Sequence, residues 1–229
     1  MGQGMAGGTV VFDLDGTLAD TAADLIAAAN ACFESRGLGC LLDPAADAGI
    51  AFHGGRAMLR AGYARIPADR LLPPDAEEVD FPRLLSFYDD GIANATRLYD
   101  GTEAALDALA GAGHILTVCT NKPEVLAEKL LAALGVRDRF AALVGADTLP
   151  VRKPDPRPYA AAVERAGGSV GRSFLVGDTE TDVRTARAAG VPVALIGFGP
   201  EGPGIARLSP DAVIGGFAEL PALAGRWLG

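Results

Sequence analysis

Residues 9–18 read Thr-Val-Val-Phe-Asp-Leu-Asp-Gly-Thr-Leu, and this stretch decides the fold. The β-branched and apolar residues at its start are typical of a short buried strand. The strand runs into Asp15-Gly16-Thr17, where Asp and Gly favour a turn. Two acidic residues, Asp13 and Asp15, therefore stand at the end of a buried strand.

Strand-like and helix-like segments alternate from Tyr99 onward. The expected strands cover residues 115–120, 141–145, 173–177, 191–198 and 212–214, and the expected helices cover residues 102–112, 123–134, 156–166 and 181–189. Strands that alternate with helices of about ten residues predict a parallel sheet with helices on both faces. The fold class is therefore α/β, with a Rossmann-like parallel sheet core.

Residues 20–95 have a different pattern. Leu25, Ile26, Ala29 and Phe33 recur at helical spacing, and further helical stretches follow around residues 57–66 and 81–95. No convincing strand is present in this segment. The sequence therefore predicts a core of residues 1–19 and 96–229, interrupted by a helical domain over residues 20–95.

The composition of the 229 residues excludes several classes of function. The formal net charge of −9 repels the phosphate backbone of nucleic acids. No apolar run approaches the ~18 residues of a membrane span, and residues 1–8 lack the basic and apolar regions of a secretory signal. The three cysteines form no CxxC pair, which argues against a disulfide framework or a zinc site. We expect a cytoplasmic protein, monomeric or homodimeric, without a membrane or nucleic acid partner.

Polar residues gather where the predicted strands end. Parallel α/β sheets carry their functional residues at the carboxyl ends of the strands. The polar residues at these positions are Asp13, Asp15, Thr120, Asn121, Asp178 and Asp182, and Lys153 lies in a loop just before a helix. We expect four carboxylates, one hydroxyl and one ammonium of this set to converge on one edge of the sheet.

This set of side chains indicates phosphoryl transfer. Carboxylates that lie close together repel one another unless a cation lies among them, and oxygen ligands suit Mg²⁺. A lysine and a hydroxyl beside the metal suit a phosphoryl group. One Asp can act as the covalent nucleophile, and a second Asp two residues later can act as general acid and base.

Four short motifs resemble those of the haloacid-dehalogenase superfamily, in order along nearly the whole chain. Asp-Leu-Asp-Gly-Thr at residues 13–17 resembles the first motif, and Thr120 at the end of an apolar strand resembles the second. Lys153 in Lys-Pro-Asp-Pro resembles the third motif, and residues 177–182 resemble the fourth, GDxxxD. Within the superfamily, residues 118–123 and 145–150 resemble the phosphoglycolate phosphatase group.

The resemblance implies a role for each acidic residue of the motifs. Asp13 is expected to be the nucleophile and a ligand of Mg²⁺, and Asp178 a further ligand. Asp15 is expected to be the general acid and base, with its backbone carbonyl on the metal. Dehalogenases of the superfamily lack an acid at the position of Asp15, so its presence favours phosphate chemistry over halide chemistry.

The resemblance also implies how the phosphoryl group is held. Thr120, with the backbone N–H of Asn121, is expected to bind phosphoryl oxygens, and Lys153 to neutralise negative charge. Asp182 is expected to orient Lys153 or a metal-bound water. Taken alone, Asp178 and Asp182 also fit a helix N-terminus with an acid in its first turn.

The inserted segment resembles the helical cap of these enzymes, which closes over the site and carries specificity. The loop His53-Gly54-Gly55-Arg56 is our candidate for the part that meets the substrate. Its glycines permit close approach, and Arg56 can pair with a substrate carboxylate.

The expected function is Mg²⁺-dependent hydrolysis of a small phosphorylated metabolite, with 2-phosphoglycolate the leading candidate. The alternatives from the same superfamily are a sugar-phosphate phosphatase and phosphoryl transfer of the β-phosphoglucomutase type. A phosphoryl-accepting signalling module of the receiver type also uses an Asp and Mg²⁺ on a parallel sheet. Such modules are about half this length and lack a helical insertion after the nucleophile strand.

Overall fold

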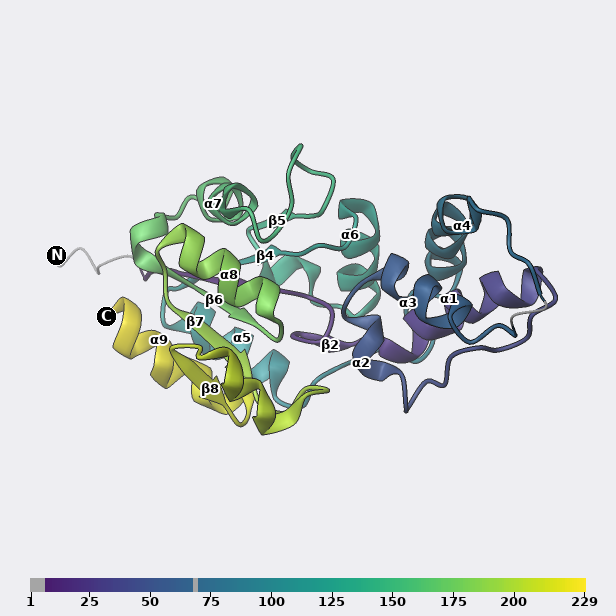
Figure 1. Ribbon diagram of the computed structural model, residues 1–229. Coiled ribbons are helices and arrows are strands. Elements are labelled where there is room, and N and C mark those ends of the chain that lie inside the picture. The colour runs from purple at the N-terminus through teal and green to yellow at the C-terminus, as the bar shows by residue number, and fades with distance from the viewer. Residues whose placement is uncertain (1–6, 68–69) are drawn as a thin grey trace, which may run out of the picture. The chain divides into compact units, whose positions relative to one another are not determined.

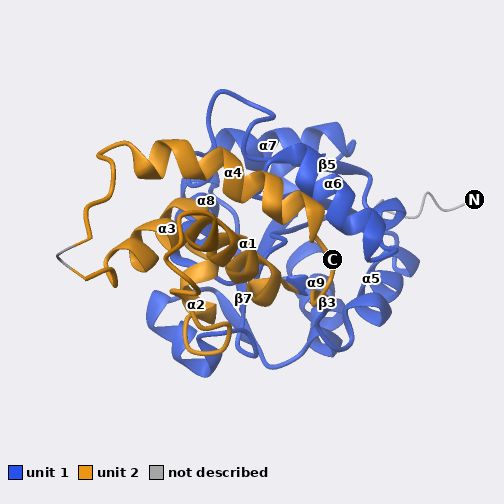
Figure 2. Cartoon of the chain, turned by 90° about the vertical axis from the view of Figure 1, so that its right-hand side faces the viewer, with its two compact units in different colours: residues 1–19, 98–229 blue, residues 20–97 orange. Residues whose placement is uncertain are grey.

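The computed structural model describes residues 7–67 and 70–229 (Figure 1). Most of residues 1–8, which were considered above for a secretory signal, lie outside the described residues. The chain divides into two compact units, which we call the sheet unit, residues 1–19 and 98–229, and the helical unit, residues 20–97 (Figure 2). The sequence placed the end of the helical domain at residue 95, and the helical unit of the structure ends two residues later, at residue 97.

Six parallel strands form the sheet of the sheet unit, in the order β5-β4-β1-β6-β7-β8. They are β1 (Thr9–Phe12), β4 (Ile115–Cys119), β5 (Ala142–Val144), β6 (Ser173–Gly177), β7 (Val193–Ile196) and β8 (Ala212–Ile214). In the centre, Thr9 of β1 pairs with Ile115 of β4 on one side and with Ser173 of β6 on the other. The predicted α/β fold with a parallel sheet is confirmed.

Helices follow the strands at the four places that the alternating pattern predicts, and a further helix over residues 220–228 was not expected from the sequence. They are α5 (Thr102–Gly111), α6 (Glu124–Ala133), α7 (Pro156–Arg165), α8 (Glu180–Ala189) and α9 (Leu220–Leu228), with short 3₁₀ turns η1 (Arg137–Arg139), η2 (Val170–Arg172), η3 (Gly202–Leu208) and η4 (Phe217–Glu219). Helix α7 begins cleanly because Asp155 accepts a hydrogen bond from the N–H of Arg157 and Pro156 occupies the first helical position.

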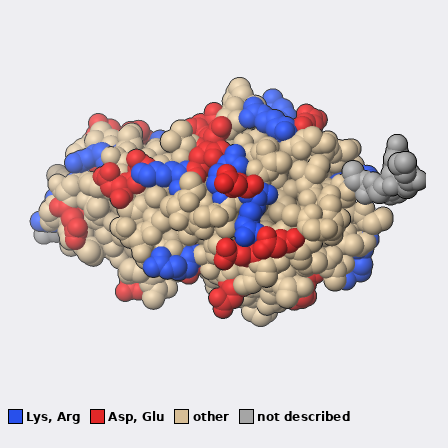
Figure 3. All heavy atoms as spheres, turned by 180° about the vertical axis from the view of Figure 1, so that it is seen from behind, with Lys and Arg blue, Asp and Glu red and all other residues tan. Residues whose placement is uncertain are grey.

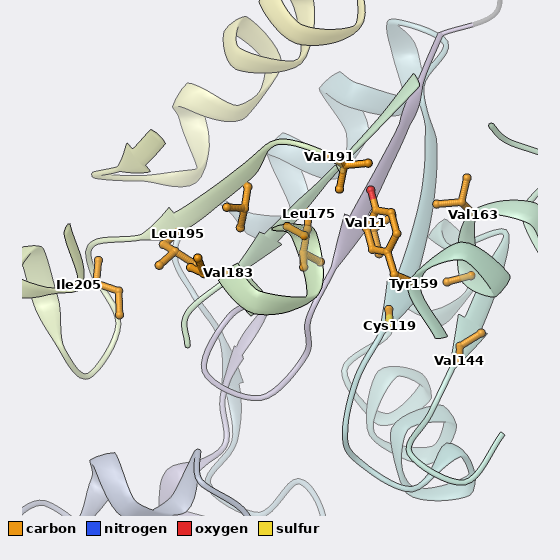
Figure 4. Close-up of a cluster of buried hydrophobic side chains, with 13 residues drawn as sticks. Val11, Cys119, Val144, Tyr159, Val163, Leu175, Val183, Val191, Leu195 and Ile205 are labelled. Carbon is orange, nitrogen blue, oxygen red and sulfur yellow. The ribbon is translucent and has the colours of Figure 1, made fainter. Parts of the chain in front are cut away.

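Successive residues of β6 show how helices cover both faces of the sheet. Leu175 belongs to a buried cluster with Tyr159 of α7 and Val183 of α8 (Figure 4). Phe174 packs edge-on against Trp227 of α9, with ring centroids 5.0 Å apart. Neighbouring side chains of a strand point to opposite faces. The two faces of the sheet are therefore buried by different helices, which holds the strand ends rigidly.

The helical unit contains α1 (Ala22–Ser35), α2 (Ala48–Ala51), α3 (Gly55–Tyr63) and α4 (Ala76–Asp90). Its connections to the sheet unit run through a two-stranded pair, β2 (Ala19–Asp20) and β3 (Arg97–Leu98). Helix α4 begins earlier than expected and contains Pro82. Proline removes one backbone hydrogen bond, but burial of Leu84 and Tyr88 on the same helix outweighs that loss.

Buried carboxylates hold the helical unit together. Asp80 of α4 is fully buried and accepts hydrogen bonds from Arg36, at 2.9 Å from Nη2, and from Tyr63. Asp24 of α1 accepts hydrogen bonds from the N–H groups of Ala95 and Thr96. Removal of a buried charge partner is strongly destabilising, so these contacts make the inserted residues a body of their own.

On the face shown in Figure 3, the described positive and negative side chains are interspersed and form no large basic patch. Within the described ranges, every helix is too short or too polar to cross a membrane.

Candidate active site

The candidate site lies on the sheet unit, where β1, β4 and β6 end. These three strands are neighbours in the sheet, so the residues that follow them meet at one edge. The turn after β1 requires Gly16, whose φ of 78° lies in the left-handed region that disfavours other residues. Its N–H donates to the carbonyl of Ala19 at 2.9 Å, which closes the turn that carries Asp15.

Asp13 is a buried carboxylate held from both sides. Its N–H donates to the carbonyl of Val176 at 2.9 Å, which continues the ladder between β1 and β6. Its Oδ1 accepts a hydrogen bond of 2.7 Å from the N–H of Leu14, and its Oδ2 lies 3.0 Å from Nζ of Lys153. Burial raises the pKa of Asp13 to about 6, although Lys153 opposes the shift.

Lys153 lies between two carboxylates. Its ammonium is 1% exposed and contacts Asp13 at 3.0 Å and Asp182 at 2.7 Å. Burial alone would lower the pKa of Lys153, but the two carboxylates together outweigh it and raise that pKa, so the group stays charged. Nδ2 of Asn121 donates to the carbonyl of Lys153 at 3.0 Å, which ties the lysine loop to the end of β4.

Asp182 uses both of its oxygens. Oδ1 accepts from Lys153, and Oδ2 accepts from the N–H and the hydroxyl of Thr179 at 3.1 and 2.7 Å, which forms a capping box at the start of α8. A Cβ on Gly177 would lie 2.4 Å from Cγ of Asp182, so the motif needs glycine there. One side chain thus contacts both the start of α8 and Lys153, and a role of Asp182 in orienting Lys153 stays a prediction.

Asp178 is joined to the turn after β1. Its Oδ1 accepts a hydrogen bond of 2.7 Å from the hydroxyl of Thr17, which is fully buried. Burial raises the pKa of Asp178 well above its usual value, and the nearby charges of Asp182 and Asp13 add to that shift. The sequence marked Thr17 only as part of a motif, and its contact with Asp178 is new.

Thr120 and Asn121 occupy the end of β4. The N–H of Thr120 donates to the carbonyl of Val144 at 2.9 Å, and its hydroxyl accepts from the N–H of Lys122 at 3.2 Å. Thr120 is 3% exposed, whereas Asn121 is exposed. The strand thus ends with its hydroxyl at the edge where Asp13 and Asp178 lie.

A second lysine at the site was missed by reasoning from the sequence. Nζ of Lys122 lies 2.8 and 2.9 Å from the two carboxylate oxygens of Asp15. The one signal in the sequence that could have indicated Lys122 is the rarity of lysine, because only three of the 20 Lys and Arg residues are lysines. Two of the three, Lys122 and Lys153, are buried at this edge of the sheet.

The donor set fits a hard divalent cation. Asp13, Asp178 and Asp182 each offer a carboxylate oxygen, and these oxygens lie within 4.8 Å of one another. Asp15 is the fourth carboxylate at this edge. Four carboxylates and the two ammonium groups of Lys122 and Lys153 give a formal excess of two negative charges. Asp182 is fully buried and both of its oxygens accept hydrogen bonds, whereas Asp13 and Asp178 keep a small exposed fraction, so these two are the carboxylates better suited to a metal.

Arg56, the substrate-binding candidate of the inserted segment, lies on α3 of the helical unit. Its Nη1 is 3.0 Å from Oε1 of Glu77, and its guanidinium lies 4.5 Å from the centroid of the Phe81 ring. These contacts orient the side chain within the helical unit. A substrate role for Arg56 stays a prediction.

Comparison with known proteins places these residues in a family. Residues 10–196 match the model of the haloacid dehalogenase-like hydrolases. The chain is 38% identical over 211 residues to a phosphoglycolate phosphatase of Mesorhizobium japonicum, covering 92% of each chain. It is 41% identical over 195 residues to one of Xanthomonas campestris, covering 82% of this chain and 83% of that protein.

A solved structure has a similar fold. A protein of Haemophilus somnus described as a predicted phosphoglycolate phosphatase superposes with a TM-score of 0.84 and 26% sequence identity. The match covers 96% of this chain and 99% of the other.

Proposed function

Because the chain belongs to the haloacid dehalogenase-like hydrolase family and is a phosphatase that acts on phosphate monoesters, we propose that its substrate is 2-phosphoglycolate and that the reaction passes through an aspartyl-phosphate on Asp13. The observation that carries the mechanism is the buried contact of Asp13 with Lys153, itself fixed by Asp182. The substrate rests on the names of relatives at about 40% identity. We place the reaction in the cytoplasm.

Asp13 is the group that attacks phosphorus. Its Oδ1 is engaged by the N–H of Leu14, and its Oδ2 lies beside Lys153. As one carboxylate oxygen bonds to phosphorus, the bond between phosphorus and the leaving oxygen breaks. Lys153 stays protonated and offsets the negative charge that gathers on the carboxylate and the phosphoryl oxygens.

Asp15 is the general acid of the first half-reaction and the general base of the second. It first donates a proton to the leaving oxygen and so becomes a carboxylate. That carboxylate then accepts a proton from water as the water oxygen bonds to phosphorus and the bond to Asp13 breaks. The proton on Asp15 is thereby restored, and glycolate and phosphate leave.

The remaining residues orient the phosphoryl group and the cation. Thr120 and the N–H of Asn121 are proposed to bind phosphoryl oxygens. Asp13, Asp178 and the carbonyl of Asp15 are proposed to hold Mg²⁺. When bound, Mg²⁺ supplies the positive charge that draws the phosphoryl oxygens into the acidic site.

The helical unit is proposed to act as the cap that excludes water and selects the substrate. Asp80 fixes α4 to Arg36 and Tyr63, and Asp24 fixes α1 to the segment that follows α4, so the unit can move as a body. Arg56 is its proposed contact for a substrate carboxylate.

Phosphate release from a panel of monoesters tests the proposal. The panel contains 2-phosphoglycolate, hexose phosphates, nucleoside monophosphates and p-nitrophenyl phosphate, each with Mg²⁺ and with a chelator. We expect strict metal dependence and the highest kcat/KM for 2-phosphoglycolate. Equal weak turnover of all compounds would reject the substrate, and transfer to a sugar in place of water would indicate a mutase. Absence of phosphate release from every compound would reject the reaction.

A further inference from the structure

Lys122 carries a buried charge that the reaction described above does not use. Its side chain is 3% exposed, and its ammonium lies 2.8 and 2.9 Å from the two oxygens of Asp15, which is 19% exposed. The two residues are 107 positions apart in the chain, on the loops that follow β4 and β1. Removing an ammonium from water is costly, so a buried lysine in this place calls for a function.

The backbone of Lys122 is fixed on both sides. Its N–H donates to the hydroxyl of Thr120 at 3.2 Å, and its carbonyl accepts from the N–H of Ala146 at 2.9 Å. Gly145 lets these segments approach, because a Cβ there would lie 2.8 Å from the carbonyl oxygen of Lys122. The side chain therefore starts from a rigid point at the end of the sheet.

The two buried lysines contact different carboxylates. Lys153 is shared by Asp13 and Asp182, and Lys122 holds both oxygens of Asp15. One ammonium in contact with both oxygens selects a single orientation of a short side chain that otherwise has several rotamers. Because Lys153 already contacts Asp13 and Asp182, Lys122 is the lysine in position to orient Asp15.

We propose that Lys122 is a positioning residue that holds Asp15 in the orientation needed for proton transfer, an inference that rests on the proposed function. In this role Lys122 acts through Asp15 and not on the phosphoryl group or the metal. Loss of the ammonium is expected to leave substrate binding intact and to slow the steps that use Asp15. Misplacement of a catalytic group by 1 Å can lower a rate by roughly 100-fold.

A rival role is direct binding of the substrate carboxylate by Lys122. The two roles differ in what Lys122→Met changes. The positioning role lowers kcat for substrates with and without a carboxylate and leaves KM nearly constant. The binding role raises KM for carboxylated substrates alone.

The experiment compares the wild type with Lys122→Met, Lys122→Arg, Asp15→Asn and the double variant Lys122→Met/Asp15→Asn. Lys129→Met, which removes the exposed lysine that follows on α6, is the control and is expected to match the wild type. We expect Lys122→Met to lower kcat for 2-phosphoglycolate about 10- to 100-fold with KM changed less than about threefold. Lys122→Arg is expected to recover part of the loss, and the double variant to be no slower than Asp15→Asn.

Rapid mixing with p-nitrophenyl phosphate adds a readout that general damage to the fold would not give. Its leaving group needs little protonation, so phosphorylation of Asp13 stays fast while hydrolysis of the aspartyl-phosphate, which needs Asp15 as base, slows. Lys122→Met is therefore expected to show a burst of p-nitrophenolate followed by slow turnover. A crystal structure of the variant is expected to show Asp15 in a different rotamer.

Several outcomes would overturn the inference. They are a wild-type kcat in Lys122→Met, losses that multiply in the double variant, and a rise in KM confined to carboxylated substrates. If Lys122→Met fails to fold, Lys122→Gln is judged by the same criteria. An inactive wild type would refute the proposed function itself, whereas an active wild type, an impaired Asp15→Asn and a normal Lys122→Met would refute only the role of Lys122.

Discussion

The hydroxyl of Thr17 donates a hydrogen bond of 2.7 Å to Oδ1 of Asp178, across 161 positions of the chain. The contact joins the turn after β1 to the end of β6, the two segments that carry Asp13 and Asp178. Thr17 is fully buried and has no route to solvent. It therefore acts on the proposed metal ligand by fixing the direction of its carboxylate.

The first prediction concerns this contact. Thr17→Val keeps the shape of the side chain but removes the hydroxyl, which leaves Asp178 less well oriented. We expect the affinity for Mg²⁺ to fall about 10- to 100-fold. Activity measured against Mg²⁺ concentration and titration calorimetry check this. Thr17→Ser retains the hydroxyl and is expected to stay close to the wild type, and equal metal affinity in the Val variant would contradict the prediction.

The second prediction concerns the nucleophile. Asp13→Asn removes the attacking charge with little change in shape, so we expect kcat to fall by roughly 10⁴-fold or more while the protein stays folded. Mass spectrometry after acid quenching is expected to find one added phosphoryl group on Asp13 in Asp15→Asn and none in Asp13→Asn. Glu180→Gln removes an exposed acid from the same edge and is expected to leave turnover unchanged. Turnover by Asp13→Asn would contradict the covalent mechanism.

The third prediction concerns the pH dependence of stability in the metal-free protein. The pKa of Asp13 is about 6 in the folded chain, against a usual value of 3.8. Between these values the folded state holds a proton that the unfolded chain has released. The stabilisation from Asp13 is therefore fully present below about pH 4 and is lost as the pH rises through about 6. The raised pKa of Asp178 acts in the same direction.

Urea unfolding in the presence of a chelator measures this effect. The free energy of unfolding of the wild type, minus that of Asp13→Asn, is expected to decrease between pH 4.5 and pH 7.5. Added Mg²⁺ is expected to stabilise the wild type more at pH 7.5 than at pH 5, because protons compete for the same carboxylates. A difference that is constant or rises with pH would contradict the assignment.

The site positions that could be predicted from the sequence are those that follow from local patterns. Asp13 and Asp15 follow an apolar strand, and Asp178 and Asp182 lie before and within the first turn of a helix, so the patterns of strand end and helix start predict where they lie. The parallel sheet follows from the same alternation. Gly177 is equally local in its effect, because it contacts Asp182 only five positions away.

The residues that the sequence did not reveal depend on contacts between distant segments. Lys122 and Asp15 are 107 positions apart, and nothing in Thr-Asn-Lys-Pro indicates which acid the lysine meets. Thr17 reads as a turn residue until β6 is placed beside β1. The sequence placed the start of α4 around residue 81, but the helix begins at Ala76 and continues through Pro82, because burial of Leu84 and Tyr88 stabilises it.

The last prediction separates the two arginines that bind Glu77. Arg56 contacts Oε1 of Glu77 at 3.0 Å and lies over Phe81, and Arg60 contacts Oε2 at 2.6 Å and is 68% exposed. If Arg56 binds a substrate carboxylate, Arg56→Ala is expected to raise KM for 2-phosphoglycolate about tenfold, because a charge-assisted hydrogen bond contributes roughly 1.5–3 kcal/mol. KM for p-nitrophenyl phosphate, which has no carboxylate, is expected to change little.

Arg60→Ala is the matched control, because it also removes one positive charge and one arginine contact with Glu77. It therefore controls for damage to the helical unit and is expected to leave both KM values near those of the wild type. An equal rise in both variants would assign the effect to Glu77 and the packing of α3, and an unchanged KM in Arg56→Ala would remove Arg56 from the substrate site.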